Sequence, residues 1–214
     1  MTRIVYLHGF ASSPESGKAR FFGGRFAELG VPFMAPQLDE GNFEGLTISG
    51  QLRVVDAAVA GEPVVLMGSS LGGYVAALYA ARNMETVEKL VLLAPAFQFP
   101  TRWRARYSAE ELELWRVRGT IPFFHYGFKE ERGLGFLMVE DAAQYEDEPD
   151  FRQPGLVLHG RRDDVVPVEL SKAFVARHKN ATLRVVESGH ELTDVLEELW
   201  TATAGFLGYV IDSR

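Results

Sequence analysis

One serine in this chain has the surroundings of an activated nucleophile. An apolar run, residues 64–67, ends in Gly68-x-Ser70-x-Gly72 and leads into a helix-forming stretch, which is the strand, tight turn and helix context of a nucleophile elbow. Such a turn holds the serine hydroxyl at the end of a sheet, and glycines on either side lack the Cβ atoms that would collide there. The alternative interpretation is a glycine-rich turn with an idle serine.

A serine hydroxyl is a weak nucleophile until a base takes its proton, so a base and a group that orients it are expected elsewhere. His190 fits the base, because it follows an apolar strand and a Ser-Gly turn. Asp163 and Asp164 both follow the preceding apolar strand, and either could hold the imidazole. The order along the chain is then serine, aspartate, histidine, as in hydrolases built on an elbow.

Two backbone N–H groups could stabilise the charge that develops on a carbonyl oxygen under attack. One belongs to Leu71, directly after the serine. We assign the other to Phe10, because the glycine-bearing turn His8-Gly9 follows the first apolar run. Such a donor is worth about 2.7–4 kcal/mol in the transition state, because it meets charge that exists only there.

Other polar residues have simpler interpretations. His8 and His159 precede glycines at strand ends and are expected to anchor loops, while His178 is expected to be solvated. Glu191 and Asp194 are expected to cap the last helix. Three arginines, Arg102, Arg104 and Arg106, could meet an anionic group of a substrate, but we favour a solvated face for them.

The elements that would position these groups follow from hydrophobic periodicity. Short apolar runs alternate with helical patterns, which is typical of a parallel sheet covered on both faces. The runs are residues 4–7, 31–35, 64–67, 90–93, 156–158 and 183–186. Helices are expected from Ser13-Pro14, over residues 48–59, after Ser70, over 168–177 and at the C-terminal end. A single doubly wound α/β domain over residues 1–214, with six parallel strands, is predicted.

Residues 98–151 interrupt this alternation. The segment has 54 residues and holds 11 of the 25 aromatic residues, too long for an ordinary crossover. Ser108-x-x-Glu111 resembles a capping box and predicts a short helix to about Arg118, and a second helix is expected over 136–145.

We interpret residues 98–136 as a helical, aromatic-rich cap over a pocket at the strand ends. The candidate pocket residues are Phe97, Trp103, Phe123, Phe124 and His125. Ordinary core packing or a dimer contact is the alternative for the aromatic residues, and His125 is more simply a packed or interfacial histidine.

Composition excludes several classes of function. The formal net charge of −7 argues against nucleic-acid or anionic-membrane binding. The chain has no cysteine, and its five histidines lack metal-ligand spacing, so no metal or other cofactor is expected. No apolar run has the length of a signal peptide or a membrane span. We therefore expect a cytoplasmic protein without membrane insertion, monomeric or homodimeric.

The chain resembles α/β-hydrolases of the small bacterial YqiA-type esterase group. Four segments carry the resemblance in family order: residues 6–14, residues 68–73, residues 159–167 and residues 188–190. The resemblance selects Asp163 over Asp164 as the acid and implies the spatial strand order 2-1-3-4-5-6. It also implies ester hydrolysis through an acyl-enzyme, without a cofactor.

Together these observations predict a carboxylesterase that acts on short- or medium-chain acyl esters. Ser70 would be the nucleophile, His190 the base and Asp163 its orienting acid. A thioesterase, a lactonase or a C–C bond hydrolase would use the same groups. A binding protein that keeps the fold without turnover is the alternative of another class.

Overall fold

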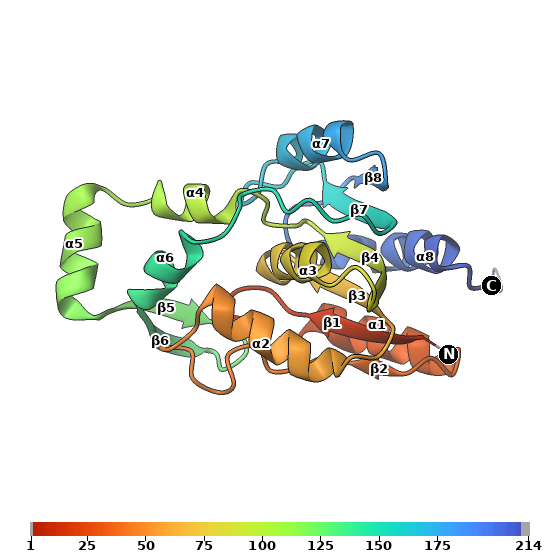
Figure 1. Ribbon diagram of the computed structural model, residues 1–214, viewed down its shortest axis with the longest axis horizontal. Helices are drawn as coiled ribbons and strands as arrows, with labels where there is room; N and C mark the ends of the chain where they lie inside the picture. The colour runs from red at the N-terminus through yellow and green to blue at the C-terminus, as the bar shows by residue number, and fades with distance from the viewer. Residues whose placement is uncertain (1, 211–214) are drawn as a thin grey trace.

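The computed structural model describes residues 2–210 and contains a six-stranded sheet, a two-stranded hairpin and eight α-helices (Figure 1). The sheet strands are β1 (Arg3–Leu7), β2 (Phe33–Met34), β3 (Val64–Ser69), β4 (Val87–Leu93), β7 (Gly155–Gly160) and β8 (Ala181–Val186). The helices are α1 (Gly17–Glu28), α2 (Ile48–Val59), α3 (Leu71–Arg82), α4 (Phe99–Arg104), α5 (Ala109–Arg118), α6 (Leu137–Ala142), α7 (Val168–Arg177) and α8 (Leu196–Leu207), and a short 3-10 turn, η1 (Thr193–Val195), precedes the last.

All neighbouring strands of the large sheet are parallel, and their order is β2-β1-β3-β4-β7-β8. This confirms the predicted six-stranded sheet and its strand order. The register pairs Ser69 with Leu93 and Gly160 with Val186, so the loops after β3, β7 and β8 leave the same edge of the sheet. Groups far apart in sequence are thereby brought together at this edge.

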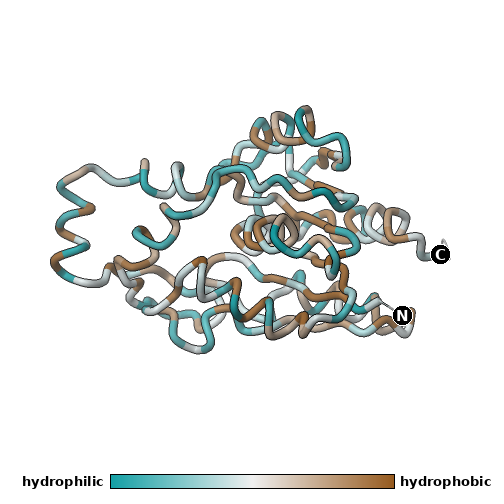
Figure 2. The backbone as a smooth tube through the Cα atoms, viewed as in Figure 1, coloured by the Kyte–Doolittle hydropathy of each residue, from teal (hydrophilic) through white to brown (hydrophobic). Residues whose placement is uncertain are grey.

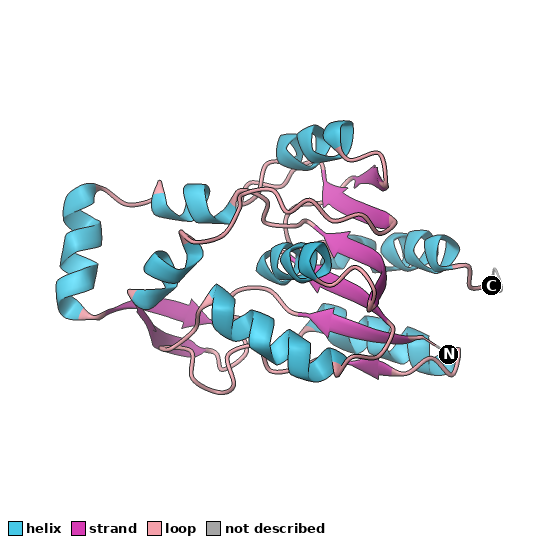
Figure 3. Cartoon of the chain, viewed as in Figure 1, coloured by secondary structure: helices cyan, strands magenta, loops and turns pink. Residues whose placement is uncertain are grey.

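Helices cover both faces of the sheet (Figure 3). Each face packs on its helices through its own cluster of buried apolar residues. Phe22 and Phe26 of α1 pack with Trp200 of α8 on one face. Helices α2, α3 and α7 cover the other face, where the larger cluster continues into residues 98–151. Apolar residues concentrate along the inner strands (Figure 2), because strands buried on both faces must be apolar on both sides.

Residues 98–151, named the insertion from here on, lie beyond the C-terminal ends of the strands (Figure 1). The helix predicted from Ser108 is α5, with both halves of the capping box present, and it ends before Gly119. The predicted helix over 136–145 is the shorter α6. The insertion is not purely helical, however, because β5 (Thr120–His125) and β6 (Glu130–Gly135) form an antiparallel hairpin.

The first helix also begins later than predicted. Ser16, not Ser13, is its N-cap, and the Ser16 side chain accepts a hydrogen bond from the N–H of Ala19. Pro14 lies in the turn before it. No helix in residues 2–210 combines the length and apolar character that a membrane span requires.

Candidate active site

Ser70 occupies a strained turn between β3 and α3. Its φ of 53° and ψ of −117° lie in a region that residues other than glycine rarely adopt. The surrounding backbone holds it there: its N–H donates to the carbonyl of Leu93 at 2.9 Å, and its carbonyl accepts from the N–H groups of Tyr74 and Ala96. The turn therefore fixes the direction of the Ser70 side chain.

The two flanking glycines are required by close backbone contacts. A Cβ on Gly68 would lie 2.3 Å from the carbonyl oxygen of Gly72, and one on Gly72 would lie 2.2 Å from the carbonyl oxygen of Leu7. Both distances are far inside van der Waals contact, and the obstructing atoms belong to the backbone. These positions can hold only glycine without moving β1 or α3.

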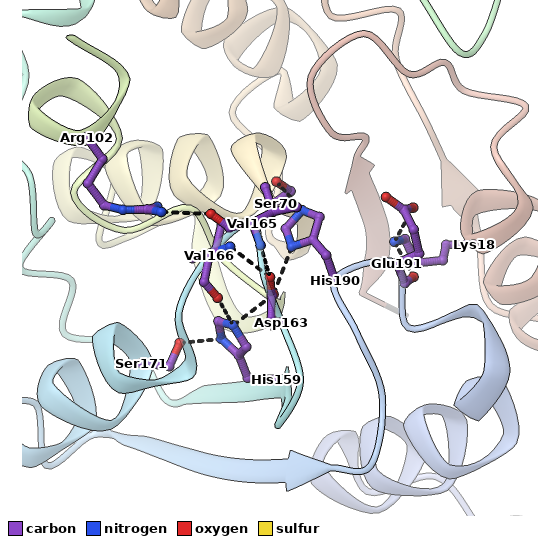
Figure 4. Close-up of polar contacts among 10 residues, drawn as sticks. All are labelled: Lys18, Ser70, Arg102, His159, Asp163, Val165, Val166, Ser171, His190 and Glu191. Atoms are coloured by element: carbon purple, nitrogen blue, oxygen red, sulfur yellow. Dashed lines mark hydrogen bonds and ion pairs between the residues drawn. The ribbon is translucent and has the colours of Figure 1, made fainter. Parts of the chain in front are cut away.

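Ser70, His190 and Asp163 form one line of hydrogen bonds, although 120 residues separate the first two (Figure 4). Nε2 of His190 lies 3.0 Å from Oγ of Ser70, and Nδ1 lies 2.8 Å from Oδ2 of Asp163. Since a carboxylate only accepts, Nδ1 carries the proton, and Nε2 is left to accept from the serine hydroxyl. The structure thus brings together three residues that were predicted from separate motifs. Asp164, the competing acid, is exposed and is absent from this line.

The side chain of Asp163 is fully buried and fully partnered. Oδ1 accepts from the N–H groups of Val165 and Val166, at 3.0 and 2.7 Å. Oδ2 lies 2.8 Å from His190 and 3.0 Å from Nε2 of His159. Burial acts to raise the pKa of Asp163, but the hydrogen bonds from both histidines and from Val166 outweigh it and hold that pKa well below its usual range.

His159 anchors the Asp163 loop, as its position before a glycine predicted. Its ring is fully buried, with Nδ1 2.8 Å from Oγ of Ser171 and Nε2 2.8 Å from the carbonyl of Val166. His8 likewise supports a loop, since its ring contacts the carbonyl of Gly9 and the N–H of Leu38. The contact between His159 and Asp163 is not visible in the sequence, because spacing alone does not tell which way a ring turns.

The loop after β1 lies beside the serine. A Cβ on Gly9 would be 3.6 Å from the Cβ of Ser70, which places Phe10 next to the nucleophile position. Leu71 is the first residue of α3, so its N–H has no acceptor within the helix. Phe10 and Leu71 both line the cleft that Ser70 and His190 open into.

This cleft has a volume of about 1120 Å³ and is partly walled by the insertion. Trp103, Phe123 and Phe124 line it, as predicted for pocket residues. The rings of Trp103 and Phe123 stack at 5.7 Å, and both contact the ring of Phe10, at 4.9 and 5.3 Å. Aromatic side chains from the insertion therefore form an apolar wall next to the loop after β1.

Two predicted pocket residues lie elsewhere. Phe97 is buried, does not line the cleft, and stacks on Phe174 of α7 with the ring centres 4.1 Å apart. His125 is also buried and does not line the large cleft. Its Nε2 lies 3.8 Å from Oδ2 of Asp39, and burial lowers the pKa of His125. Both residues satisfy packing within the fold, which competes with exposure to a pocket.

Sequence reasoning missed one group near His190. Lys18 of α1 is buried, and its Nζ donates to the carbonyl of Glu191 at 2.6 Å, with the Glu191 carboxylate 3.7 Å away (Figure 4). Burial lowers the pKa of Lys18, and Glu191 opposes that shift. Glu191 therefore pairs with α1 and does not cap the last helix. Asp194 lies in η1 and accepts from the hydroxyl of Ser188.

Residues 2–210 contain no group of three or more metal-ligating side chains that could hold an ion. What the site presents instead is a hydroxyl, an imidazole and a carboxylate in hydrogen-bond contact, with N–H groups of two loops beside them. This arrangement can accept a proton from Ser70 while its oxygen attacks an electrophile in the cleft.

Comparisons with known proteins agree with this description. The model of an uncharacterised protein family, UPF0227, matches residues 3–207. No curated protein matches the chain by sequence. Among solved structures, the chain is similar to Est1E from Butyrivibrio proteoclasticus with bound ferulic acid, at 22% identity, a TM-score of 0.81, and coverage of 97% of this chain and 90% of that one.

Two other similar structures are more distant in sequence. The alpha/beta hydrolase domain-containing protein 10 from mouse has 20% identity and a TM-score of 0.79, with 96% of this chain and 89% of that one covered. A monoacylglycerol lipase from Paleococcus ferrophilus has 16% identity and a TM-score of 0.74, with 98% and 96% covered. The fold of this chain is the α/β-hydrolase fold, which confirms the predicted fold class.

Proposed function

The chain belongs to the uncharacterised protein family UPF0227, and from that premise and the geometry around Ser70 we propose that it is a serine hydrolase. More specifically, we propose a carboxylesterase that cleaves short- or medium-chain acyl esters through an acyl-enzyme on Ser70. The observation that carries the proposal is the continuous line from Oγ of Ser70 through His190 to Asp163, with spacings of 3.0 and 2.8 Å. Both spacings are within the reach that proton transfer requires.

In the first half of the reaction, Nε2 of His190 takes the hydroxyl proton while Oγ of Ser70 bonds to the carbonyl carbon of the ester. The carbonyl oxygen becomes an oxyanion that accepts from the N–H groups of Phe10 and Leu71. His190 then gives its proton to the alcohol oxygen as the C–O bond breaks, which leaves the acyl group on Ser70.

In the second half, water replaces the alcohol. His190 takes a proton from the water as its oxygen attacks the acyl carbon, and it returns that proton to Oγ when the acid leaves. Asp163 stays ionised throughout, because its low pKa keeps it a carboxylate at neutral pH. It holds the imidazole in the tautomer with Nδ1 protonated and stabilises the ring while it is charged.

We also propose that residues 98–136 act as a cap over the cleft within the single domain. Trp103 and Phe123 support this role, because they contact the ring of Phe10 next to the nucleophile. The apolar wall that they form suits a hydrophobic acyl or alcohol group. Similar folds include a monoacylglycerol lipase and a structure with ferulic acid bound, which agrees with ester chemistry.

The decisive experiment is labelling with a fluorophosphonate probe, which phosphorylates an activated serine and spares ordinary ones. We expect one label per folded chain, on the peptide that contains Ser70, and none in Ser70→Ala. Ser69→Ala is the matched control, since Ser69 is the last residue of β3 and its side chain is buried. Absence of label on folded wild-type protein would contradict the proposal and favour a binding protein.

A panel of substrates then distinguishes carboxylesterase activity from thioesterase, lactonase and C–C bond hydrolase activity. The panel contains acyl esters and thioesters of graded chain length, lactones, and a ketone whose hydrolysis breaks a C–C bond. Hydrolysis rates are compared at equal substrate concentration, with Ser70→Ala as the blank. We expect the highest kcat/KM for a carboxylic ester. A higher value for a thioester, a lactone or a C–C bond would keep the serine hydrolase and replace the carboxylesterase.

A further inference from the structure

The structure distinguishes three arginines, Arg102, Arg104 and Arg106, which the sequence analysis treated alike. Arg102 and Arg106 line the cleft that contains Ser70, whereas Arg104, between them, does not. The Arg102 guanidinium donates to the carbonyl of Val165 at 2.7 Å, and the N–H of Val165 donates to Asp163 (Figure 4). One hydrogen bond thus ties Arg102 to the loop after β7, and a second joins that loop to the Asp163 carboxylate, which fixes the place of Arg102 in the cleft wall.

Neither Arg102 nor Arg106 has an acidic partner. Within residues 2–210, no carboxylate oxygen lies within 4.0 Å of Arg102 or Arg106. Eight other arginines have such a partner, namely Arg25, Arg82, Arg116, Arg132, Arg152, Arg161, Arg177 and Arg184. Arg20 also lines the cleft, and within residues 2–210 its guanidinium contacts a backbone carbonyl and no carboxylate, so three arginines of one cleft lack an acidic partner in a chain with a net charge of −7.

The two guanidinium groups are also close enough to influence each other. Burial lowers the pKa of Arg102, the neighbouring charge of Arg106 lowers it further, and the Asp163 carboxylate opposes the shift without contacting the guanidinium. Arg106 lies over the ring of Trp103, 5.6 Å from its centre, beside the aromatic wall of the cleft. Two like charges without a carboxylate in contact are unfavourable in the free protein, and a bound anion would relieve them.

The cleft as a whole is positive, although the protein is acidic. Its charged lining consists of five cationic side chains, Lys18, Arg20, Arg102, Arg106 and Lys129, and two carboxylates, Glu15 and Glu191. Glu191 faces Lys18, and this pair cancels, which leaves four cationic side chains and one carboxylate. A concave site of one sign concentrates ligands of the other sign and speeds their arrival.

We propose that Arg102 and Arg106 form a subsite for an anionic oxygen group of the substrate, so that the preferred ester carries a carboxylate or a phosphate on its acid or alcohol part. The inference rests on the proposed esterase function and narrows its substrate class. The planar guanidinium group suits either oxyacid, because it offers paired N–H donors to two oxygens at once. The stacked rings of Trp103 and Phe123 border the subsite and accommodate the apolar part of the same molecule.

Binding to Ser70→Ala tests the subsite without turnover. Calorimetry compares mono-para-nitrophenyl adipate with para-nitrophenyl methyl adipate, which has the same chain without the charge. A second pair moves the charge to the alcohol side: the butyrate ester of para-hydroxybenzoate and that of its methyl ester. We expect the charged member of at least one pair to bind roughly tenfold more tightly, as one charge-assisted contact predicts, and the preference to weaken as salt is added.

Variants identify the residues responsible. In the Ser70→Ala background, Arg102→Gln and Arg106→Gln should each reduce the preference for the charged ester several-fold. Glutamine is shorter than arginine and gives up the contact with the Val165 carbonyl, so the affinity of each variant for the neutral ester serves as the check that the cleft is intact. Arg104→Gln is the matched control, because it removes the same charge from the same helix outside the cleft. The same titration with a phosphate in place of the carboxylate tells which oxyacid fits better.

The outcomes separate this inference from the proposed function. Equal affinity for the charged and neutral esters in both pairs, or an equal effect of Arg104→Gln, overturns the subsite. If wild-type protein hydrolyses neutral esters while no charge preference exists, the esterase function stands and the subsite fails. If Ser70→Ala prefers the charged ester but wild-type protein hydrolyses none, the subsite stands and the esterase function fails.

Discussion

The site at the C-terminal ends of the parallel strands, called the strand edge below, and the insertion are held together by different kinds of contact. At the strand edge, Ser70 has a strained backbone and Asp163 has a partner for each of its oxygens. In the insertion, aromatic rings such as Trp103 and Phe123 hold the segment together, and Arg102 and Arg106 are left without carboxylate partners. The first region is held by close backbone contacts and by hydrogen bonds between buried groups, whereas aromatic packing contributes more to the second.

This difference indicates a division of roles. Backbone contacts tolerate almost no change, which suits groups whose positions must be held within fractions of an ångström for chemistry. Packing of side chains tolerates substitution, which suits a surface that determines which molecule enters. Substitutions that act in one region only should therefore separate stability, turnover and selectivity.

The largest expected effect is that of Gly72→Ala at the strand edge. The new Cβ would lie 2.2 Å from the carbonyl oxygen of Leu7 and 2.4 Å from that of His8. We expect a loss of more than about 4 kcal/mol in the free energy of unfolding, enough to prevent folding of many domains. Gly133→Ala in the hairpin is the contrast, since the nearest atom is the Cβ of Thr120 at 3.3 Å, and it should cost less than about 1 kcal/mol. Urea unfolding of both variants measures the difference, and similar values would refute the contrast.

Second in size is the loss of turnover in Asp163→Asn. The amide cannot hold the His190 ring in the productive tautomer, so kcat on a simple ester should fall about 10⁴-fold. The exposed neighbour in Asp164→Asn should leave kcat within about twofold of the wild-type value. If the two variants exchange these effects, Asp164 is the acid.

The buried histidines and Asp163 should affect the free energy of unfolding in different pH ranges. Burial lowers the pKa of His125, so the unfolded chain takes up a proton more readily than the folded one, and stability falls as the pH drops below about 6.5. Asp163 has a lowered pKa, so its contribution is complete above about pH 4 and is lost as the pH falls further. Thermal unfolding across this range measures both effects.

Two variants show which residue causes the loss of stability in each pH range. His125→Gln should reduce, but not abolish, the loss of stability just below pH 6.5. His8 contributes the remainder, because it is also buried and has a lowered pKa. Asp163→Asn should flatten only the decline below about pH 4. A single acid transition that neither variant changes would show that other groups control acid stability.

The smallest expected effect lies at the exposed start of α5. Ser108→Ala removes the side chain that accepts from the N–H of Glu111 and should cost about 1 kcal/mol. Hydrogen exchange should increase in α5 and leave the strands unchanged, and kcat on a neutral ester should stay the same. A loss of turnover equal to that of Asp163→Asn would mean that the insertion and the strand edge are not separable.

Much of the strand edge could be predicted because its signals are local. The glycines around Ser70 indicate a close approach of two backbone segments, and the six apolar runs indicate strands, of which β3 and β7 are buried on both faces. His190 and Asp163 follow two of those runs directly. Once the strands are parallel, their C-terminal ends meet, and the distances between these residues follow from the topology.

The insertion was predicted less well, because its structure depends on contacts that are distant in sequence. β5 has β-forming residues but contains Pro122, which weakens a strand prediction, and β6 reads Glu-Glu-Arg-Gly-Leu-Gly, which has almost no β-forming residues. The hairpin is instead tied to the loop after β1, where the N–H of Tyr126 donates to the carbonyl of Ala11 at 2.8 Å. His125 turns toward Asp39, 86 positions earlier, which no local pattern reveals.

The order of the strands has a consequence for the making of the protein. Ser70 lies 120 residues before His190, and β7 and β8 join the sheet on the far side of β4. A ribosome that adds about 5–20 residues per second needs roughly 6–24 seconds to synthesise that interval. During this time the turn that holds Ser70 can form on β1, β3 and β4, but the proposed base is absent. If Ser70 is the nucleophile, as proposed, the nascent chain carries it unactivated until the last strands have joined the sheet.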